Sequence, residues 1–261
     1  MTDLRGWTAL VTGASNGLGV DFARELAARG CSLVLTARRE AELNTVAAEL
    51  RARHGVRVEV VACDLGVAGA AEHLHTTCVA RGFVVDVLIN NAGFGLYGPF
   101  VEIDDGREQA MLQLDILSLV GLTKRFVRDM VGRKRGFVMQ VASIGAYQPS
   151  PYYASYSAAK AFVLSFGVAL AHELRGTGVS CTVVSPGVTR TAFLEVAGQT
   201  PNTFQRATMM ESAEVARIGV AAMLAGRSSI VTGWMNALNS WLMSMLPRRW
   251  SAAIGARAMR D

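Results

Sequence analysis

Two side chains in one short segment have the chemistry for proton transfer. Tyr156 and Lys160 begin and end the motif YSAAK, so a helix would place the phenol and the ammonium on one face. The pKa of an ordinary tyrosine is about 10, too high for efficient proton transfer near neutral pH. A neighbouring cation favours the phenolate, and we therefore expect Lys160 to lower the pKa of Tyr156. A chance pair on an amphipathic helix would have the same spacing, so this motif needs support from other residues.

A glycine-rich segment follows the first predicted strand. The motif TGASNGLG covers residues 12–19 and leads into a predicted helix. Its glycines Gly13, Gly17 and Gly19 would let the backbone turn sharply, approach a pyrophosphate and pack helix against strand. The free N–H groups at the helix start would favour the phosphates. Glycines between a strand and a helix can also be simple turn residues, as we expect for Gly30.

The residues after the second predicted strand bear on the choice of cofactor. An acidic residue here would bind the ribose 2′-hydroxyl of NAD(H), whereas arginine accommodates the 2′-phosphate of NADP(H). This chain has Arg38 and Arg39, and its first acid is Glu40. The pair favours NADP(H), provided that a dinucleotide binds at all. The alternative is that both arginines are the solvated start of a helix.

Strands and helices alternate along most of the chain and would position these motifs. The predicted strands are short, apolar and rich in Val, Leu and Ile, which suits a parallel sheet covered on both faces. They are residues 7–11, 32–35, 56–62, 86–90, 136–141, 179–184 and, as a last short strand, 229–232. The predicted helices include residues 18–29, 40–53, 106–130, 153–175 and 211–225, and residues 191–210 are predicted as a loop with short helices. This order predicts an α/β fold, a doubly wound, Rossmann-like parallel sheet in a single domain with helices on both faces.

Composition narrows the classes of function. The chain has 261 residues, of which 51% are hydrophobic and 18% charged, so a disordered protein is excluded. The formal net charge is +5, but the arginines are scattered without a basic, aromatic-lined face, and we expect no nucleic-acid partner. The four cysteines are far apart and the histidines are scattered, so we expect neither a metal site nor disulfides. With no secretory signal and no apolar run of about 20 residues, we expect a cytoplasmic protein that is at most peripheral to a membrane.

Three further motifs lie at the carboxyl ends of predicted strands, where open α/β sheets bind ligands. They are NNAG at residues 90–93, Ser143, and Pro186-Gly187. Together with TGASNGLG and YSAAK, in this order and spacing, they make residues 6–231 resemble the short-chain dehydrogenase/reductase family. The resemblance implies an NADP(H)-dependent oxidoreductase that transfers a hydride between nicotinamide and a carbonyl or alcohol substrate, without a metal.

The resemblance also implies roles for individual positions. Ser143, Tyr156 and Lys160 would be catalytic, with Ser143 on the substrate carbonyl, Tyr156 as general acid or base, and Lys160 on the nicotinamide ribose. Asn90 would brace the sheet. The implied cofactor-binding residues are Gly13, Ser15, Asn16, Gly17, Leu18, Gly19, Arg38, Arg39, Asp64, Leu65, Asn91, Ala92, Gly93, Tyr156, Lys160, Pro186, Gly187, Val188 and Thr191.

One residue departs from the family pattern inside the predicted site. Asp115 stands where many members have an asparagine that helps to hold a proton-relay water. A buried carboxylate is costly without a partner, and it donates no hydrogen bond unless protonated. The relay can use the backbone carbonyl instead, it can be weakened, or the chain can be a non-catalytic NADP(H)-binding or membrane-recruited module of the same fold. We expect an active enzyme.

The C-terminal segment is the second departure. We predict an oxidoreductase domain at residues 1–233 and a helical extension at residues 234–261 packed on the same domain. Trp234, Leu238, Trp241, Leu242, Met245 and Leu246 would form one apolar face, followed by Arg248, Arg249, Arg257 and Arg260. This pattern fits a helix that covers the substrate cleft or a subunit contact, which we favour, or an interfacial membrane helix with basic flanks.

Substrate and assembly are predicted only in outline. The aromatic residues Phe94, Tyr97, Tyr147, Tyr152, Tyr153 and Phe193 lie near the motifs and would suit a lipophilic carbonyl or alcohol, unless they belong to the core. Residues 109–130 and 153–171 are too apolar for helices with one wetted face, and the family pairs these two helices across subunits. We therefore expect a homodimer or homotetramer.

Overall fold

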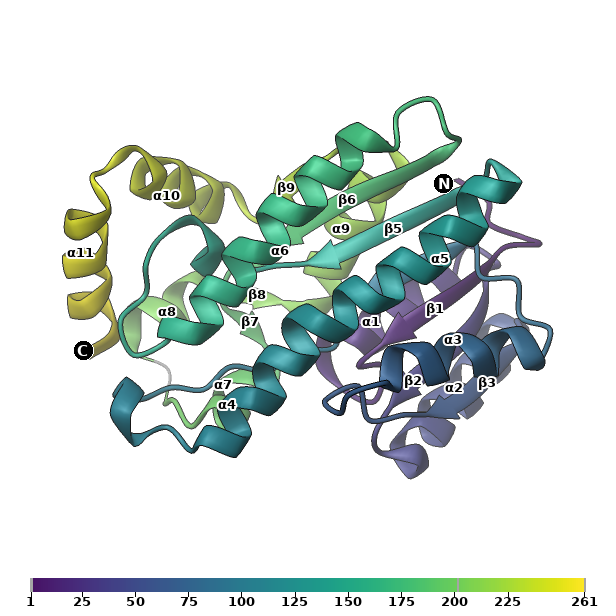
Figure 1. Ribbon diagram of the computed structural model, residues 1–261, viewed down its shortest axis with the longest axis horizontal. Coiled ribbons are helices and arrows are strands. Elements are labelled where there is room, and N and C mark those ends of the chain that lie inside the picture. The colour runs from purple at the N-terminus through teal and green to yellow at the C-terminus, as the bar shows by residue number, and fades with distance from the viewer. Residues whose placement is uncertain (1, 201, 261) are drawn as a thin grey trace.

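A seven-stranded parallel sheet forms the centre of the computed structural model, which describes residues 2–200 and 202–260 (side chains of residues 203, 204, 207 and 258–260 excepted). The strand order is β3-β2-β1-β4-β5-β6-β9, with helices on both faces (Figure 1). The strands are β1 (Thr8–Thr12), β2 (Ser32–Ala37), β3 (Val58–Ala62), β4 (Val87–Asn90), β5 (Gly136–Val141), β6 (Val179–Ser185) and β9 (Ser229–Val231). The predicted fold class is confirmed. Because the strand order reverses between β1 and β4, the sheet opens a crevice at their carboxyl ends.

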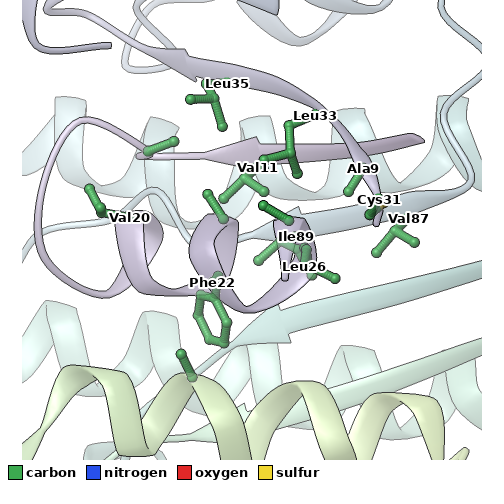
Figure 2. Close-up of a cluster of buried hydrophobic side chains, with 14 of the residues drawn as sticks. Ala9, Val11, Val20, Phe22, Leu26, Cys31, Leu33, Leu35, Val87 and Ile89 are labelled. Atoms are coloured by element: carbon green, nitrogen blue, oxygen red, sulfur yellow. The ribbon is translucent and has the colours of Figure 1, made fainter. Parts of the chain in front are cut away.

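The strands are apolar at consecutive positions because both faces of the sheet are covered. Ala9 and Val11 point into one buried cluster, and Leu10 between them points into the other. Figure 2 shows the first cluster, in which Phe22 and Leu26 pack against side chains of β1, β2 and β4. Each face therefore has its own core, and the two cores hold the strand ends in place.

The helices divide between the two faces. Residues of α1 (Gly17–Ala27), α2 (Glu40–His54) and α9 (Ser212–Leu224) belong to the first cluster. Residues of α3 (Ala70–Ala80), α5 (Leu119–Arg133) and α6 (Ala154–Glu173) belong to the second. Apart from the segment that precedes α5, the helices with predicted bounds agree with these to within about three residues; no bounds were predicted for α3.

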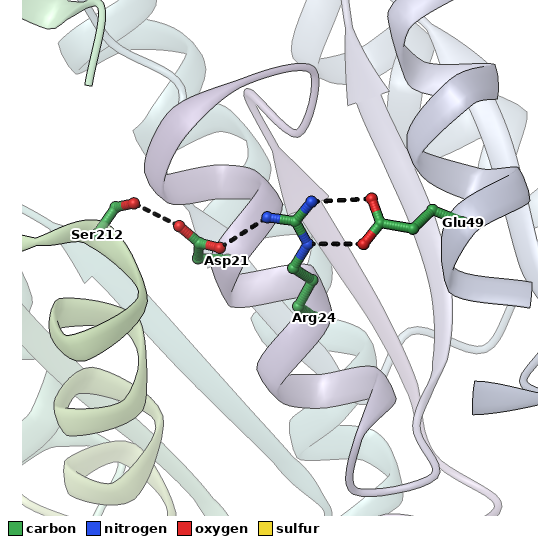
Figure 3. Close-up of polar contacts among 4 residues, drawn as sticks. All are labelled: Asp21, Arg24, Glu49 and Ser212. Carbon is green, nitrogen blue, oxygen red and sulfur yellow. Dashed lines mark hydrogen bonds and ion pairs between the residues drawn. The ribbon is translucent and has the colours of Figure 1, made fainter. Parts of the chain in front are cut away.

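A polar network joins three helices on the first face (Figure 3). Arg24 of α1 makes two hydrogen bonds to the Glu49 carboxylate of α2, at 2.8 and 2.9 Å, and a third to Asp21 at 3.0 Å. Ser212, the first residue of α9, donates to Asp21. This network links α1 to α2 and α9 at a partly exposed surface.

The single long helix predicted at residues 106–130 is three consecutive segments. They are α4 (Asp105–Leu112), the π-helical η2 (Gln113–Ser118) and α5. A π-helical turn adds a residue per turn and changes which side chains face inward, and such turns are frequent at functional sites. Here the turn carries Asp115, which is buried.

The last part of the chain contains more structure than predicted. A second, two-stranded sheet pairs β7 (Thr189–Arg190) with β8 (Met210–Glu211) around the short helices α7 (Phe193–Ala197) and α8 (Thr203–Thr208). Two helices then project at one end of the molecule, α10 (Trp234–Met245) and α11 (Arg248–Arg260) (Figure 1). Short 3₁₀ turns, η1 (Phe100–Glu102) and η3 (Ile144–Tyr147), precede α4 and α6.

One helix of the described residues, α6, is long and apolar enough to cross a membrane by length and composition. We expected no segment of this kind from the sequence. Helices packed inside a domain pass the same test, and Gly167 of α6 lies so close to β6 that a Cβ there would come within 2.4 Å of Val183. We describe α6 as a packed helix that carries Tyr156 and Lys160.

Candidate active site

A cleft of about 860 Å³ lies over the carboxyl ends of β1, β4, β5 and β6. Its size is within the roughly 300–1,000 Å³ of typical small-molecule sites. All of the predicted catalytic residues and all but one of the predicted cofactor-binding residues line it; those found there are Gly13, Ser15, Asn16, Gly17, Leu18, Arg38, Arg39, Asp64, Leu65, Asn91, Ala92, Gly93, Ser143, Tyr156, Lys160, Pro186, Gly187, Val188 and Thr191.

The exception is Gly19, which has a packing position rather than a lining one. A Cβ on Gly19 would lie 2.3 Å from the carbonyl oxygen of Gly13, so only glycine allows α1 to approach the end of β1. Gly13 has a positive φ of 67°, and a Cβ there would lie 2.9 Å from the Asn91 side-chain nitrogen and 3.0 Å from Ala92 Cα. The first and third glycines therefore bring the helix start and the end of β4 together.

The start of α1 meets the requirements of a phosphate site. The N-cap residue Asn16 makes no side-chain cap hydrogen bond, and the first turn contains no acid. The first N–H groups of a helix have no partner within the helix and carry partial positive charge. Because Gly17 and Leu18 line the cleft, this helix end fits the pyrophosphate of a dinucleotide.

Arg38 and Arg39 lie at the same end of the cleft, and both are exposed. Arg39 donates to Ser15 Oγ at 3.4 Å and forms an ion pair of 3.2 Å with Glu42. Arg38, and the Arg39 N–H groups that do not bond Ser15 or Glu42, line the cleft together with the glycine loop. Two cations at this point fit a 2′-phosphate.

Thr12 joins two of the strand ends and was not singled out by sequence analysis. Its hydroxyl donates to the carbonyl oxygen of Ile89 at 3.2 Å and accepts from the backbone N–H groups of Asn91 and Ala92, each at 2.9 Å. The Asn91 side chain donates to the Thr12 carbonyl at 2.9 Å. The only sequence signal was its place at the start of TGASNGLG.

Asn90 braces the sheet, as the family resemblance implied. Its amide donates to Thr123 Oγ1 at 2.9 Å and to Gln140 Oε1 at 3.0 Å, and Gln140 donates to Thr123 at 2.9 Å. Thr123 itself donates to the Leu119 carbonyl at 2.7 Å. This neutral cluster ties β4, β5 and α5 together beneath the cleft.

Asp115 forms a buried ion pair with Lys160. The distance from Asp115 Oδ2 to Lys160 Nζ is 3.0 Å, and the side chains are 0% and 5% exposed. Asp115 Oδ1 accepts from the backbone N–H of Phe94 at 3.3 Å, and Lys160 also donates to the Val141 carbonyl at 3.3 Å. The family resemblance implied a proton-relay water near position 115, whereas the Asp115 carboxylate contacts Lys160 directly.

The Asp115–Lys160 pair leaves no room for a side chain at position 93. A Cβ at position 93 would lie 2.8 Å from Asp115 Oδ1 and 3.0 Å from Lys160 Nζ. The last residue of the NNAG motif therefore makes room for both charges.

The pKa of Tyr156 does not follow the sequence-based expectation. Burial raises it most, the negative charge of Asp115 raises it further, and a hydrogen bond with Ser143 lowers it. Lys160 Nζ lies 5.6 Å from the tyrosine ring centroid, but its charge faces Asp115 at 3.0 Å. The pKa of Tyr156 therefore lies above its ordinary value and not below it, first because the phenol is buried and then because Asp115 is near. Burial likewise raises the pKa of Asp115, and Lys160 opposes that shift.

Part of the predicted aromatic set lines the cleft. Phe94, Tyr153 and Phe193 do so, and the ring of Phe193 lies 5.3 Å from that of Tyr156. Tyr153 donates to Gln199 at 2.8 Å. Tyr97, Tyr147 and Tyr152 do not line the cleft; Tyr97 and Tyr152 pack behind Tyr153 and against each other.

The start of α10 borders the same cleft. A Cβ on Gly187 would lie 2.2 Å from the amide nitrogen of Asn236, which donates to the Thr232 carbonyl at 2.9 Å. Sequence analysis missed Asn236 because it lies on the polar side of a helix whose apolar side drew attention.

Comparisons with known proteins point to one protein family. A family model described as short chain dehydrogenase matches residues 7–202. The very-long-chain 3-oxoacyl-CoA reductase of Pyrenophora tritici-repentis is 31% identical over 92% of this chain and 72% of its own length. A short-chain dehydrogenase from Sphingobium yanoikuyae in complex with NADPH superposes with a TM-score of 0.82 at 28% identity, over 92% of this chain and 96% of that one. A short chain dehydrogenase/reductase from Burkholderia phymatum in complex with NAD has the same TM-score at 25% identity, over 93% and 94% of the two chains.

Proposed function

Because the chain belongs to the short chain dehydrogenase family and is an oxidoreductase, we propose that it is an NADP(H)-dependent reductase of lipophilic carbonyl compounds, with Tyr156 as the general acid. The observation that carries this proposal is that Ser143, Tyr156 and Lys160 line the same cleft as the glycine loop. Ser143 follows β5 and caps the turn η3, whereas Tyr156 and Lys160 lie on α6.

The cofactor is proposed from the geometry of the cleft. The open start of α1 would hold the pyrophosphate, Arg38 and Arg39 a 2′-phosphate, and the loop from Pro186 to Thr191 the nicotinamide end. A nicotinamide cofactor supplies or accepts a hydride when bound. The solved relatives include complexes with NADPH and with NAD, so the preference for NADP(H) rests on the two arginines.

Three side chains of this protein would perform the proton chemistry. Ser143 would donate a hydrogen bond to the substrate carbonyl oxygen, and Tyr156 would transfer its proton to that oxygen as negative charge develops there. Burial and Asp115 raise the pKa of Tyr156, so the phenol is protonated at neutral pH and is a weaker acid than an ordinary tyrosine. The protonated phenol would serve reduction, and Lys160, held by Asp115, would supply positive charge near the phenol.

The substrate class is proposed from the cleft wall and from one relative. Phe94, Leu114, Phe193 and Leu194 give the substrate side an apolar surface, which favours a lipophilic ketone over a sugar. The fungal relative named a very-long-chain 3-oxoacyl-CoA reductase makes 3-oxoacyl thioesters the first ketones to test.

Steady-state oxidation of NADPH tests the proposal. A panel of aliphatic aldehydes, bulky ketones and 3-oxoacyl thioesters would be compared between the natural chain and Tyr156→Phe. We expect turnover with at least one lipophilic carbonyl, and a fall in kcat of roughly 10²–10⁴-fold in the variant, with NADPH binding unchanged. Binding of NADPH without turnover of any panel member would instead support the non-catalytic alternative, for which the direct Asp115–Lys160 pair is the specific observation.

Cofactor preference has its own test. Replacing Arg38 and Arg39 by Gln should weaken NADPH binding by at least about tenfold, because each charge-assisted hydrogen bond contributes about 1.5–3 kcal/mol, and should leave NADH binding nearly unchanged. Equal losses for both cofactors would contradict the assignment of these arginines.

We also propose a homodimer or homotetramer. Leu117, Phe162 and Val168 are exposed on η2 and α6, with exposures of 61%, 41% and 39%. Apolar side chains on two adjoining helices fit a contact between copies of the chain. Light scattering should give a mass of two or four chains, and Phe162→Glu should lower it.

A further inference from the structure

The two C-terminal helices bury polar residues against the domain and expose apolar ones to solvent, which is the opposite of the usual arrangement. On α10 the buried residues are Asn236 and Ser240, whereas the exposed ones are Trp234, Met235, Leu238, Trp241, Leu242 and Met245. On α11 the buried residues include Ser251 and Gly255, and Trp250 and Ile254 are exposed. We call these eight exposed apolar side chains the tail face.

Packing explains why the polar side is inward. Asn236 is fixed by hydrogen bonding to Thr232 and by the close approach of Gly187, while Gly255 lies against the backbone of Pro149. At these two contacts the inner side of the hairpin meets polar and backbone groups, and between them Met243 and Leu246 border a hollow of about 610 Å³. The apolar stripe of the tail face lies on the outer side. Trp234, Trp241 and Trp250 are 76%, 56% and 56% exposed.

Charge identifies what the tail face would contact. Residues 234–261 contain four arginines and a single acid, Asp261, which lies outside the described residues. Arg248, Arg249 and Arg257 are exposed beside Trp250 and Ile254 (the side chain of Arg260 lies outside the described part). Tryptophan beside arginine, on a helix with an apolar face, is the composition of segments that lie in the interface of a membrane.

We propose that the tail face docks on an anionic lipid bilayer, with its tryptophans at the headgroup level and its arginines on the lipid phosphates. A second copy of this chain fits less well, because a twofold contact would bring Arg248, Arg249 and Arg257 of both copies together, and the described part of the segment has no acid to pair with them. The proposal is independent of the proposed catalytic activity, since it concerns only the tail face.

The distribution of tryptophan makes the test direct. Three of the four tryptophans are on the tail face, and the fourth, Trp7, lies under the Arg135 guanidinium at 3.9 Å. Tryptophan emission of the full chain would be recorded with vesicles of phosphatidylcholine alone and of phosphatidylcholine with phosphatidylserine, together with flotation. We expect a blue shift, protection from an aqueous quencher and flotation with the anionic vesicles.

Two variants and two matched controls separate the contributions. The apolar variant Leu238→Ser with Leu242→Ser should abolish flotation, whereas Phe100→Ser with Val101→Ser, which removes exposed apolar side chains elsewhere, should not. Neutralising Arg248 and Arg249 to Gln should weaken binding to anionic vesicles roughly 25-fold, at about fivefold per arginine, whereas Arg53→Gln with Lys124→Gln should leave it unchanged.

Three results would overturn the proposal. The first is an unchanged emission spectrum with every vesicle, and the second is equal affinity for neutral and anionic vesicles. The third is a molecular mass that rises with protein concentration and falls in the apolar variant, together with protection of tryptophan from the quencher without lipid. That result would show that a second copy of the chain covers the tail face. Unchanged circular dichroism of the variants would show that they are folded.

Discussion

Two buried polar clusters lie at the ends of β4 and β5, and they differ in charge. Asn90, Thr123 and Gln140 form a neutral cluster in which each amide finds partners between 2.9 and 3.0 Å. Asp115 and Lys160 form a charged pair in which burial raises the pKa of the carboxylic acid. Fully satisfied neutral groups can be buried at little cost, whereas buried charges are expensive and depend on each other. The first cluster therefore holds the strands at any pH, and the second is sensitive to pH and adjoins the reactive phenol.

The largest difference between the clusters should appear when one partner of the ion pair is removed. Lys160→Met leaves the Asp115 carboxylate buried without its counter-ion, and we expect a loss of about 3–5 kcal/mol in the free energy of unfolding. Urea denaturation measures it. Adding Asp115→Asn to this variant should restore most of the loss, and a double variant as unstable as the single one would contradict the pairing.

A smaller effect is expected from the neutral cluster. Thr123→Val removes the oxygen that accepts from both Asn90 and Gln140, and leaving buried donors unpaired should cost about 1–3 kcal/mol. Thr45→Val, on the exposed side of α2, is the matched control and should change stability far less. The loss in Thr123→Val should not depend on pH between about 6 and 9, because none of these three side chains titrates.

Asp115→Asn should reveal the influence of the charged pair in the pH dependence of the reaction. The Asp115 charge raises the pKa of Tyr156, so its removal should lower that pKa. Reduction needs the protonated phenol and falls as pH rises through this pKa, and the fall should therefore move to lower pH in the variant. The rise of the reverse, oxidative rate should move to lower pH as well. Profiles of kcat/KM that coincide for the two chains would show that the carboxylate has no influence on the phenol.

The smallest effect should come from the surface network of Figure 3. Arg24 is 41% exposed and Glu49 38%, so Arg24→Gln should cost only about 0.5–1 kcal/mol at neutral pH. The Arg24 hydrogen bond lowers the pKa of Glu49, so this contribution is present above the ordinary glutamate pKa and is lost as pH falls through the depressed one. Thermal unfolding of both chains at neutral and acidic pH should show the difference only at neutral pH.

The sequence predicted the cleft well because its motifs mark strand ends. In a parallel sheet the carboxyl ends of strands meet at one edge, so Gly13, Asn91, Ser143 and Pro186 had to converge once the strands were identified. The helix that carries Tyr156 and Lys160 was identified by the same alternation, and its bounds were within two residues.

The sequence could not predict contacts that depend on helix rotation. The apolar spacing of residues 106–130 is compatible with one continuous helix, and nothing in it reveals the π-helical turn that points Asp115 at Lys160. For α10 the spacing correctly predicts an apolar stripe, and five of its six predicted members are exposed, with Leu246 half-buried. Spacing alone does not predict which side of α10 faces the domain, because the close contact between Asn236 and Gly187 decides it.

The scarcity of lysine has a practical consequence for handling the protein. Of Lys124, Lys134 and Lys160, only the first two are exposed, and both belong to α5 or its C-terminal cap. Reagents that acylate amines should therefore couple the chain to a sensor chip through α5 or the terminal amine and spare the buried Lys160. Figure 1 places the end of α5 across the molecule from α11, so a chain immobilised there would present its C-terminal hairpin to the flowing solution.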